Sequence, residues 1–286
     1  MLIKRIILLF FRDKANVFFS LLAVLIIIGL YILFLGDMME QSLRFSLGFD
    51  SDKIGVTMSS VILAGMIAVT GITSCMGAMN ISVNDKEGAA KDFLTSPASR
   101  RKITGGYIFG SACIGMIMSL VALGICLIYI AANGGVLPNP ADFGLLLMTV
   151  FLSVLCGNSM VYFMSVFIKT DNAFSAVSTV IGTLIGFLMG IYVPIGQLPE
   201  TVQWVIKCFP LSHAASMFRQ LLADEGLTVL FTDASPEVLD GFREMFGITF
   251  TYGNYTAGFW FSAFVLIVST VVFYIASLLV MRFRKA

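Results

Sequence analysis

The residues best suited to chemistry lie in one charged segment, residues 84–102. Its mixture of acidic, basic and apolar side chains predicts a docking element that faces the cytosol. Either Asn84 or Asp85 can cap a short helix there, and Pro97 ends it, because proline disfavours helical geometry at the preceding residue. Phe93 adds an apolar tip to the charged face. A solvated loop that only carries positive charge is the alternative.

Catalytic chemistry has no comparable support. A Walker A loop requires Gly-Lys-[Ser/Thr], and none of the nine lysines follows a glycine, so we expect no ATP-binding site on this chain. Neither HExxH nor GxSxG occurs, and the one histidine, His213, is expected to be a structural hydrogen-bonding residue near the extracellular surface. The stretch from Gly105 to Gly110 lacks the phosphate-binding lysine and predicts helix packing.

Cofactors and nucleic acids are also unsupported. The five cysteines form no CxxC pair, which predicts neither a zinc site nor a disulfide framework, and we expect them to be small buried side chains. A formal net charge of +1 gives no basic footprint for nucleic acid. We therefore expect no metal and no cofactor on the chain itself.

The composition indicates that a membrane surrounds these residues. Of the 286 residues 58% are hydrophobic and only 12% are charged, whereas soluble domains carry about 25% charged residues. Six uncharged apolar runs are each long enough to cross a hydrocarbon core about 30 Å thick. They cover residues 17–35, 54–79, 103–132, 143–168, 173–195 and 257–281. We expect an all-α membrane protein with six transmembrane helices in one domain, residues 1–286.

Positive charge predicts how the helices are oriented. Thirteen Lys and Arg residues lie on the side of the two termini and of residues 84–102, and five lie on the other side. The positive-inside rule therefore places both termini in the cytoplasm. Residues 1–16 mix basic and apolar side chains, which predicts an interfacial helix in the headgroup plane. We expect a multi-pass protein of the cell membrane, and specifically of a bacterial cytoplasmic membrane.

The absence of charge inside the six runs disfavours a proton-driven carrier. Asn158 and the backbone at helix breaks could still line a sodium site. In the fifth run Gly182, Gly186 and Gly190 lie four residues apart, which predicts close approach of another helix. That helix belongs either to the same subunit or to a second copy.

Residues 196–256, between the fifth and sixth runs, are too long for a connector. Prolines forbid one continuous helix there, yet the segment is too apolar for a free loop. We expect short re-entrant helices that form an extracellular gate, with an interfacial aromatic belt as the alternative. The predicted gate residues are Pro194, Leu198, Pro199, Trp204, Phe209 and Pro210. Residues 236–246 further predict an amphipathic helix on the outer membrane surface or on a lid.

Two segments resemble the membrane subunits of type-2 ABC exporters. The first is similar to the signature of that family's cytoplasmic coupling helix and reads Asp85-Lys86-Glu87-Gly88-(x)4-Phe93-Leu94-Thr95-Ser96-Pro97-(x)2-Arg100. The second resembles the segment that leads into the family's re-entrant helices and reads Pro194-Ile195-Gly196-Gln197-Leu198-Pro199-Glu200-(x)3-Trp204-(x)4-Phe209-Pro210-Leu211. The resemblance covers nearly the whole chain, and residues 222–255 depart from it as an extracellular insertion.

The resemblance implies how the chain is assembled. It implies a permease that works as two copies, identical or related, with two separate ABC ATPase subunits that hold ATP and magnesium. Residues 1–16 would be the elbow helix of the family, and Gly182, Gly186 and Gly190 would face the second copy. The residues implied to couple to the ATPase are Asp85, Lys86, Glu87, Lys91, Phe93, Leu94, Pro97 and Arg100.

We therefore expect a transport subunit without enzymatic activity of its own. Its cargo would be amphipathic or lipophilic, such as a drug, a lipid or a hydrophobic natural product, because apolar, Met and aromatic side chains would line the pathway. Two alternatives stay open. One is a carrier or channel that works without ATP, and the other is a membrane scaffold or sensor that moves nothing.

Overall fold

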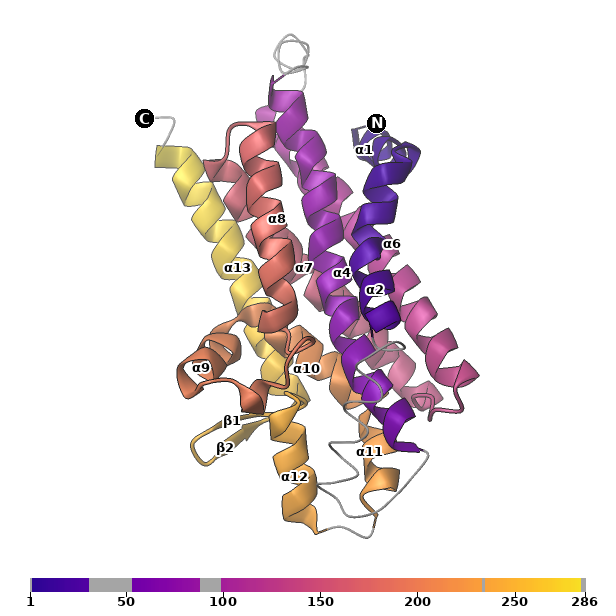
Figure 1. Cartoon of the computed structure of the whole chain (residues 1–286). Helices are drawn as coiled ribbons and strands as arrows, with labels where there is room; N and C mark the ends of the chain where they lie inside the picture. The colour runs from indigo at the N-terminus through magenta and orange to yellow at the C-terminus, as the bar shows by residue number, and fades with distance from the viewer. Residues whose placement is uncertain (1, 31–52, 88–98, 233–234, 284–286) are drawn as a thin grey trace.

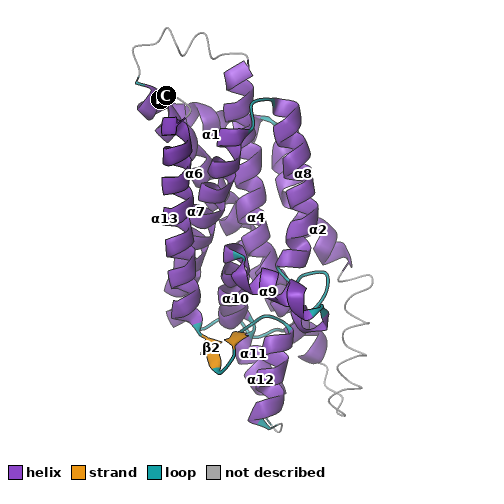
Figure 2. Cartoon of the chain, turned by 90° about the vertical axis from the view of Figure 1, so that its left-hand side faces the viewer, coloured by secondary structure: helices purple, strands orange, loops and turns teal. Residues whose placement is uncertain are grey.

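The computed structural model describes residues 2–30, 53–87, 99–232 and 235–283, and it is mostly helical. Long helices run side by side, with α1 (Leu2–Arg12) and the end of α13 (Phe259–Phe283) at the same end of the bundle (Figure 1). We call this end the terminal end. The opposite end, which we call the distal end, consists of short helices and a small hairpin (Figure 2).

Five helices of the described residues are long and apolar enough to cross a membrane. They are α4 (Lys53–Glu87), α6 (Arg100–Ala132), α7 (Phe143–Phe167), α8 (Asp171–Leu188) and α13. Each matches one of the predicted runs. The first predicted run, residues 17–35, is helical in α2 (Lys14–Leu30), and its last five residues lie outside the described part of the chain.

The helix α4 is the axis of the bundle. In the most apolar 18-residue stretch of α4, 89% is buried inside the protein. The corresponding share is 11% in α13 and 17% in α8. Helices α2, α6, α7, α8 and α10 (Pro210–Leu222) all pack on α4. With 35 residues α4 is about 50 Å long, so it continues beyond a hydrocarbon core of about 30 Å. It therefore links the two ends of the molecule.

Two helices end at other residues than the predicted runs do. The second predicted run stops at residue 79, but α4 continues to Glu87, because charged residues end a lipid-facing surface without ending a helix. The fifth predicted run reaches residue 195, but α8 ends at Leu188. Gly190 follows with φ of 61°, a conformation that glycine adopts without strain. The amides of Gly190 and Ile191 then bond back to Phe187 and Gly186, which completes a Schellman turn.

The distal segment, residues 189–258, contains more structure than the predicted re-entrant helices. Its elements are η3 (Ile195–Gln197), α9 (Glu200–Cys208), α10, α11 (Asp224–Leu230), α12 (Pro236–Met245), β1 (Phe250–Tyr252) and β2 (Tyr255–Ala257). The two strands pair antiparallel, a hairpin that an all-α prediction lacks. A further short helix, η2 (Pro140–Asp142), precedes α7.

Two distal helices are packed into the protein. Leu211 and Phe218 of α10 are fully buried in the main core together with residues of α4 and α7. Phe242 of α12 packs in a second cluster with Ile54 and Met58 of α4. The apolar stripe of the amphipathic helix predicted at residues 236–246 therefore packs on the protein, in one cluster with residues of α4 and α11.

Candidate functional site

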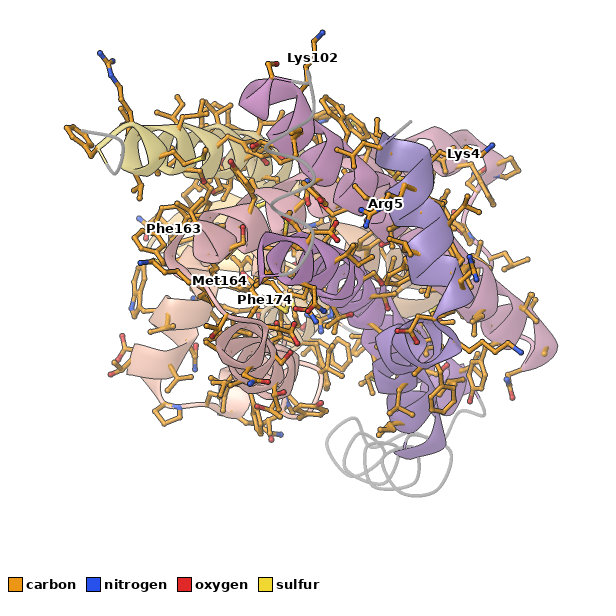
Figure 3. The ribbon with its side chains drawn as sticks, turned by 90° about the horizontal axis from the view of Figure 1, so that it is seen from above. Lys4, Arg5, Lys102, Phe163, Met164 and Phe174 are labelled. Atoms are coloured by element: carbon orange, nitrogen blue, oxygen red, sulfur yellow. The ribbon has the colours of Figure 1, made fainter. Side chains whose placement is uncertain are left out.

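At the terminal end one cluster of charged and polar groups joins three helices. Arg5 of α1 donates two hydrogen bonds to Asp85 of α4, from Nη1 to Oδ2 (2.6 Å) and from Nη2 to Oδ1 (3.0 Å). The hydroxyl of Tyr107 in α6 donates to the same Oδ2. Figure 3 looks onto this end and shows Arg5 on the bundle side of α1, whereas Lys4 points away. Asp85 therefore fixes α1 and α6 to the last turn of α4.

The spacing of apolar residues places α1 against the bundle. Leu2, Ile6 and Phe10 lie four residues apart on one face, and Ile6 and Phe10 are fully buried. Leu2 and Ile6 contact α6 at Gly106 and Gly110, where any Cβ would press on them. The prediction that these glycines serve helix packing is confirmed. The hydrogen bond to Asp85 raises the pKa of Arg5 above its ordinary value, so Arg5 stays charged at physiological pH.

The predicted ATPase-coupling residues begin at this cluster. Lys86 and Glu87 follow Asp85 as the last two residues of α4, and Arg100 is the first residue of α6. The structure thus brings both ends of the predicted coupling segment to the terminal end. The other predicted coupling residues lie outside the described part of the chain: Lys91, Phe93, Leu94 and Pro97.

The helix cap in this region differs from the predicted one. Asn84 and Asp85 lie inside the last turn of α4, so neither begins a helix. The Asp85 carboxylate binds the side chain of Arg5 instead of backbone amides. The observed cap is Ser99, whose Oγ accepts a hydrogen bond from the amide of Lys102 at the start of α6.

The predicted gate residues gather at the distal end, where η3, α9 and α10 follow one another. Pro194 and Pro199 directly precede η3 and α9, and Pro210 is the first residue of α10, so each proline marks a helix start. Trp204 of α9 is 46% exposed, and its ring centroid lies 6.0 Å from that of Tyr252. The other two predicted gate residues are half-buried against apolar neighbours. They are Leu198 and Phe209.

Arg219 was not among the predicted site residues, and its charge is one of the five assigned above to the extracellular side. Arg219 of α10 is 1% exposed, and its side-chain hydrogen bonds within the described part of the chain go to backbone carbonyls. Nε donates to Val61 of α4 (3.1 Å), and Nη1 donates to Gly247 (3.4 Å). Nη2 donates to Met189 (2.6 Å) and Gly190 (3.1 Å). Because these acceptors lie about 30 to 160 residues from Arg219, no local pattern could have found them.

The three glycines of the predicted dimer face have different surroundings. A Cβ at Gly182 would meet nothing within 4 Å. At Gly186 it would overlap the ring of Tyr192, which packs on the helix at this point. Gly190 is buried at the turn after α8, beside Ile195. Gly186 and Gly190 are therefore used for packing within the subunit, and only Gly182 is open to a neighbour.

The comparisons with known proteins agree with this arrangement. The profile of the family described as "ABC-2 type transporter" matches residues 1–223. The chain belongs to this family. No curated protein matches the chain. The family match ends directly after α10, next to the residues 222–255 that the sequence analysis identified as an insertion.

Membership of the ABC-2 type transporter family gives the chain its general role. It is a multi-pass membrane protein and the permease component of an ABC transporter, which lacks the ATPase site. Permeases of the family work with ABC ATPase subunits, so a partner of this kind is expected.

His213 connects four elements of the ABC-2 permease at the distal end. Its Nδ1 lies 3.1 Å from Ser262 Oγ of α13, and its Nε2 lies 3.1 Å from the carbonyl of Lys207 at the end of α9. The Tyr252 hydroxyl of β1 donates to the same Lys207 carbonyl (2.7 Å). The prediction of a structural hydrogen-bonding histidine is confirmed. Burial lowers the pKa of His213, and the hydrogen bond to Lys207 offsets only part of this effect.

We expect the permease to lose stability below about pH 6.5, where a histidine in the unfolded chain takes up a proton. Because the pKa of His213 is lowered in the folded state, the unfolded chain binds more protons at this pH. The unfolding free energy should fall by at most about 1.4 kcal/mol per pH unit below that point and be constant above it. Unfolding curves between pH 5 and 7.5 in detergent measure this, with His213→Gln as the control without the titrating group. A difference between the two proteins that does not change with pH would contradict the prediction.

Proposed function

We propose that the chain is the membrane subunit of an ATP-driven exporter, assembled from two permease copies and two ATPase subunits. Both termini and the segment between α4 and α6 face the cytoplasm, and α2 is the first of six spans. The segment from Asp85 to Arg100 is the coupling helix that follows the ATPases as they close on ATP. Residues around α9 and α10 form the extracellular gate.

The observation that carries this proposal is the continuity of α4. One helix of 35 residues begins beside the distal segment and ends at the predicted coupling residues. At its distal end Val61 accepts a hydrogen bond from Arg219 of α10, and at its terminal end Asp85 binds Arg5 and Tyr107. An α-helix is stiff along its axis, so a push on one end is transmitted to the other. ATP binding outside the membrane core can thereby act on a gate about 50 Å away.

The surface of α8 supports a second permease copy beside it. Ser175, Thr179 and Thr183 lie on one exposed face of α8, and Gly182 is next to them. Hydroxyl groups gain little from contact with lipid chains, whereas small and hydroxyl residues let two helices approach closely. This face therefore meets the second copy or the cargo pathway between the copies. The cargo is amphipathic or lipophilic, since no span of the described chain offers a charged group to the pathway.

The first experiment is gentle purification of the tagged chain from its own host, followed by mass spectrometry of what accompanies it. We expect a stoichiometric ABC ATPase with the wild-type chain and its loss with Phe93→Ala, because a truncated apolar anchor commonly costs more than about 2 kcal/mol of binding. The matched control is Phe283→Ala. Phe283 is 78% exposed at the end of α13, on the same side of the molecule, and its truncation should leave the ATPase bound.

Two outcomes would contradict the proposal. A clean chain without any ATPase would favour a carrier that uses ion gradients. A bound ATPase whose ATP hydrolysis moves nothing in reconstituted vesicles would favour a scaffold or sensor. Within the proposal, Glu87→Arg should abolish transport but not membrane insertion. Stimulation of ATP hydrolysis by lipophilic compounds, and not by small inorganic ions, would support the proposed class of cargo.

A further inference from the structure

The buried charge of Arg219 is balanced by two helix ends. Among the described residues, no ion pair involves Arg219. Met189 and Gly190 follow the last residue of α8, and Gly247 lies just beyond the end of α12. Each helix C-terminus carries about half a negative charge, so the two ends together offset about one positive charge. Burial lowers the pKa of Arg219 to about 10, which leaves the guanidinium charged at pH 7.

Glycines make room for this arrangement on three sides. Gly190 and Gly247 have φ of 61° and 64°, and each forms the left-handed turn that ends its helix. On α4 a Cβ at Gly65 would lie 3.0 Å from Nη2 of Arg219. The missing side chain exposes the carbonyl of Val61, one turn earlier, to the guanidinium. The backbones of α4, α8 and α12 thus converge on one side chain of α10.

We infer that Arg219 is the positioning residue that makes the distal segment move together with α4 and α8. This inference rests on the proposed function and adds the point at which movement passes from α4 to the gate. A shift of α4 must either carry the ends of α8 and α12 with it or break hydrogen bonds to a buried charge. Breaking them leaves an ionised group unpaired in an apolar core, which is strongly unfavourable. The four elements therefore move as one body.

The test uses the permease with its ATPase in vesicles and compares Arg219→Lys with Arg243→Lys. Lysine keeps the charge of Arg219 but cannot reach carbonyls on three sides with a rigid planar group. We expect amide exchange at residues 186–191 and 245–248 to accelerate at least about tenfold, since both turns lose partners. Cargo moved per ATP hydrolysed should fall about 2- to 30-fold, the range by which residues between two sites change their coupling.

Arg243 is the matched control because it lies on α12 in the same segment but binds the carboxylates of Asp224 and Asp240. Its replacement by lysine keeps the charge of a partly exposed ion pair and should leave both measurements within about twofold of wild type. Gly65→Ala is a second variant that retains Arg219 and crowds Nη2, and it should change both measurements in the same direction. Its own control is Gly105→Ala, where a Cβ meets nothing within 4 Å.

The outcomes separate the inference from the proposed function. Unchanged exchange in Arg219→Lys would overturn the attachment of the distal segment to α4. Faster exchange with unchanged cargo per ATP would overturn the transmission of movement through Arg219. A wild-type complex that hydrolyses ATP but moves no cargo contradicts the proposed function, and the exchange rates then still support or overturn the attachment.

Discussion

Replacing Asn158 by leucine is expected to lower the free energy of unfolding by about 2–3 kcal/mol. Asn158 of α7 is fully buried between α6 and α13. Its Nδ2 donates to the carbonyl of Ile108 (3.1 Å) and to the hydroxyl of Tyr274 (3.0 Å), and its Oδ1 accepts from Ser111. The side chain that could have lined a sodium site instead holds three spans together. Leucine has a similar volume, so the loss comes from unpaired polar groups in the membrane interior rather than from a cavity.

A double-mutant cycle with Tyr274→Phe tests the assignment. Ser111 can donate its hydrogen bond to the carbonyl of Ile108 instead (3.1 Å), whereas the hydroxyl of Tyr274 has no other hydrogen-bond partner within the described residues. Tyr274→Phe in the Asn158→Leu background should therefore recover about 1 kcal/mol relative to the sum of the single changes. Unfolding in mixed micelles measures all four proteins. Strict additivity would show that Asn158 and Tyr274 do not interact.

The long helices were predictable because lipid allows few alternatives. A lipid-exposed backbone must bond within its own helix, so each uncharged run of sufficient length becomes a span. The runs 103–132 and 143–168 accordingly correspond to Arg100–Ala132 and Phe143–Phe167. The same reasoning fails at the end of the fifth run. Residues 189–195 are as apolar as a span, but the left-handed turn at Gly190 ends α8, and hydropathy does not register backbone conformation.

The distal core was not predictable because its polar residues find partners far away in sequence. The helix α10 contains His213, Ser216 and Arg219, a composition typical of a surface helix, yet all three are buried. Ser216 donates to the carbonyl of Ile248, and Arg219 binds three other elements. From the composition one can estimate what it costs to remove such polar groups from water. It does not reveal which backbone carbonyls accept their hydrogen bonds and so offset this cost.

The candidate coupling site was only partly predictable for the same reason. Asp85 was recognised by its charge and by resemblance, whereas Arg5 was assigned to lipid headgroups and Tyr107 to a packing stretch. Only the fold shows that the three meet. The cysteines behave similarly, since Cys75, Cys126 and Cys156 are buried as expected but Cys113 and Cys208 are exposed. Residue type alone does not say which side of a span faces its neighbours.

Gly186→Ala and Gly182→Ala are expected to act oppositely although they lie one turn apart on α8. At Gly186 the new Cβ overlaps the ring of Tyr192, which also packs edge-on against Phe187 at 5.0 Å. Displacing this ring destabilises the start of the distal segment by about 1–3 kcal/mol. At Gly182 the Cβ meets nothing, so the better helix propensity of alanine stabilises the chain by about 0.5–1 kcal/mol. Unfolding of both variants in detergent measures the difference, and equal effects would contradict it.

The same pair of variants tests the second permease copy, because Gly182 is the one glycine of the predicted dimer face that is open. If α8 meets the α8 helix of the second copy there, Gly182→Ala should change the stability of the single chain and the association of the two copies in opposite directions. The single chain becomes more stable, while the added methyl group holds the two helices apart and weakens their association. Crosslinking or analytical ultracentrifugation in a mild detergent should show fewer dimers at equal protein concentration. Gly105→Ala, an equally open position on α6, should leave the dimer fraction unchanged. A normal dimer fraction with Gly182→Ala would remove α8 from the interface and leave its hydroxyl face to the cargo pathway.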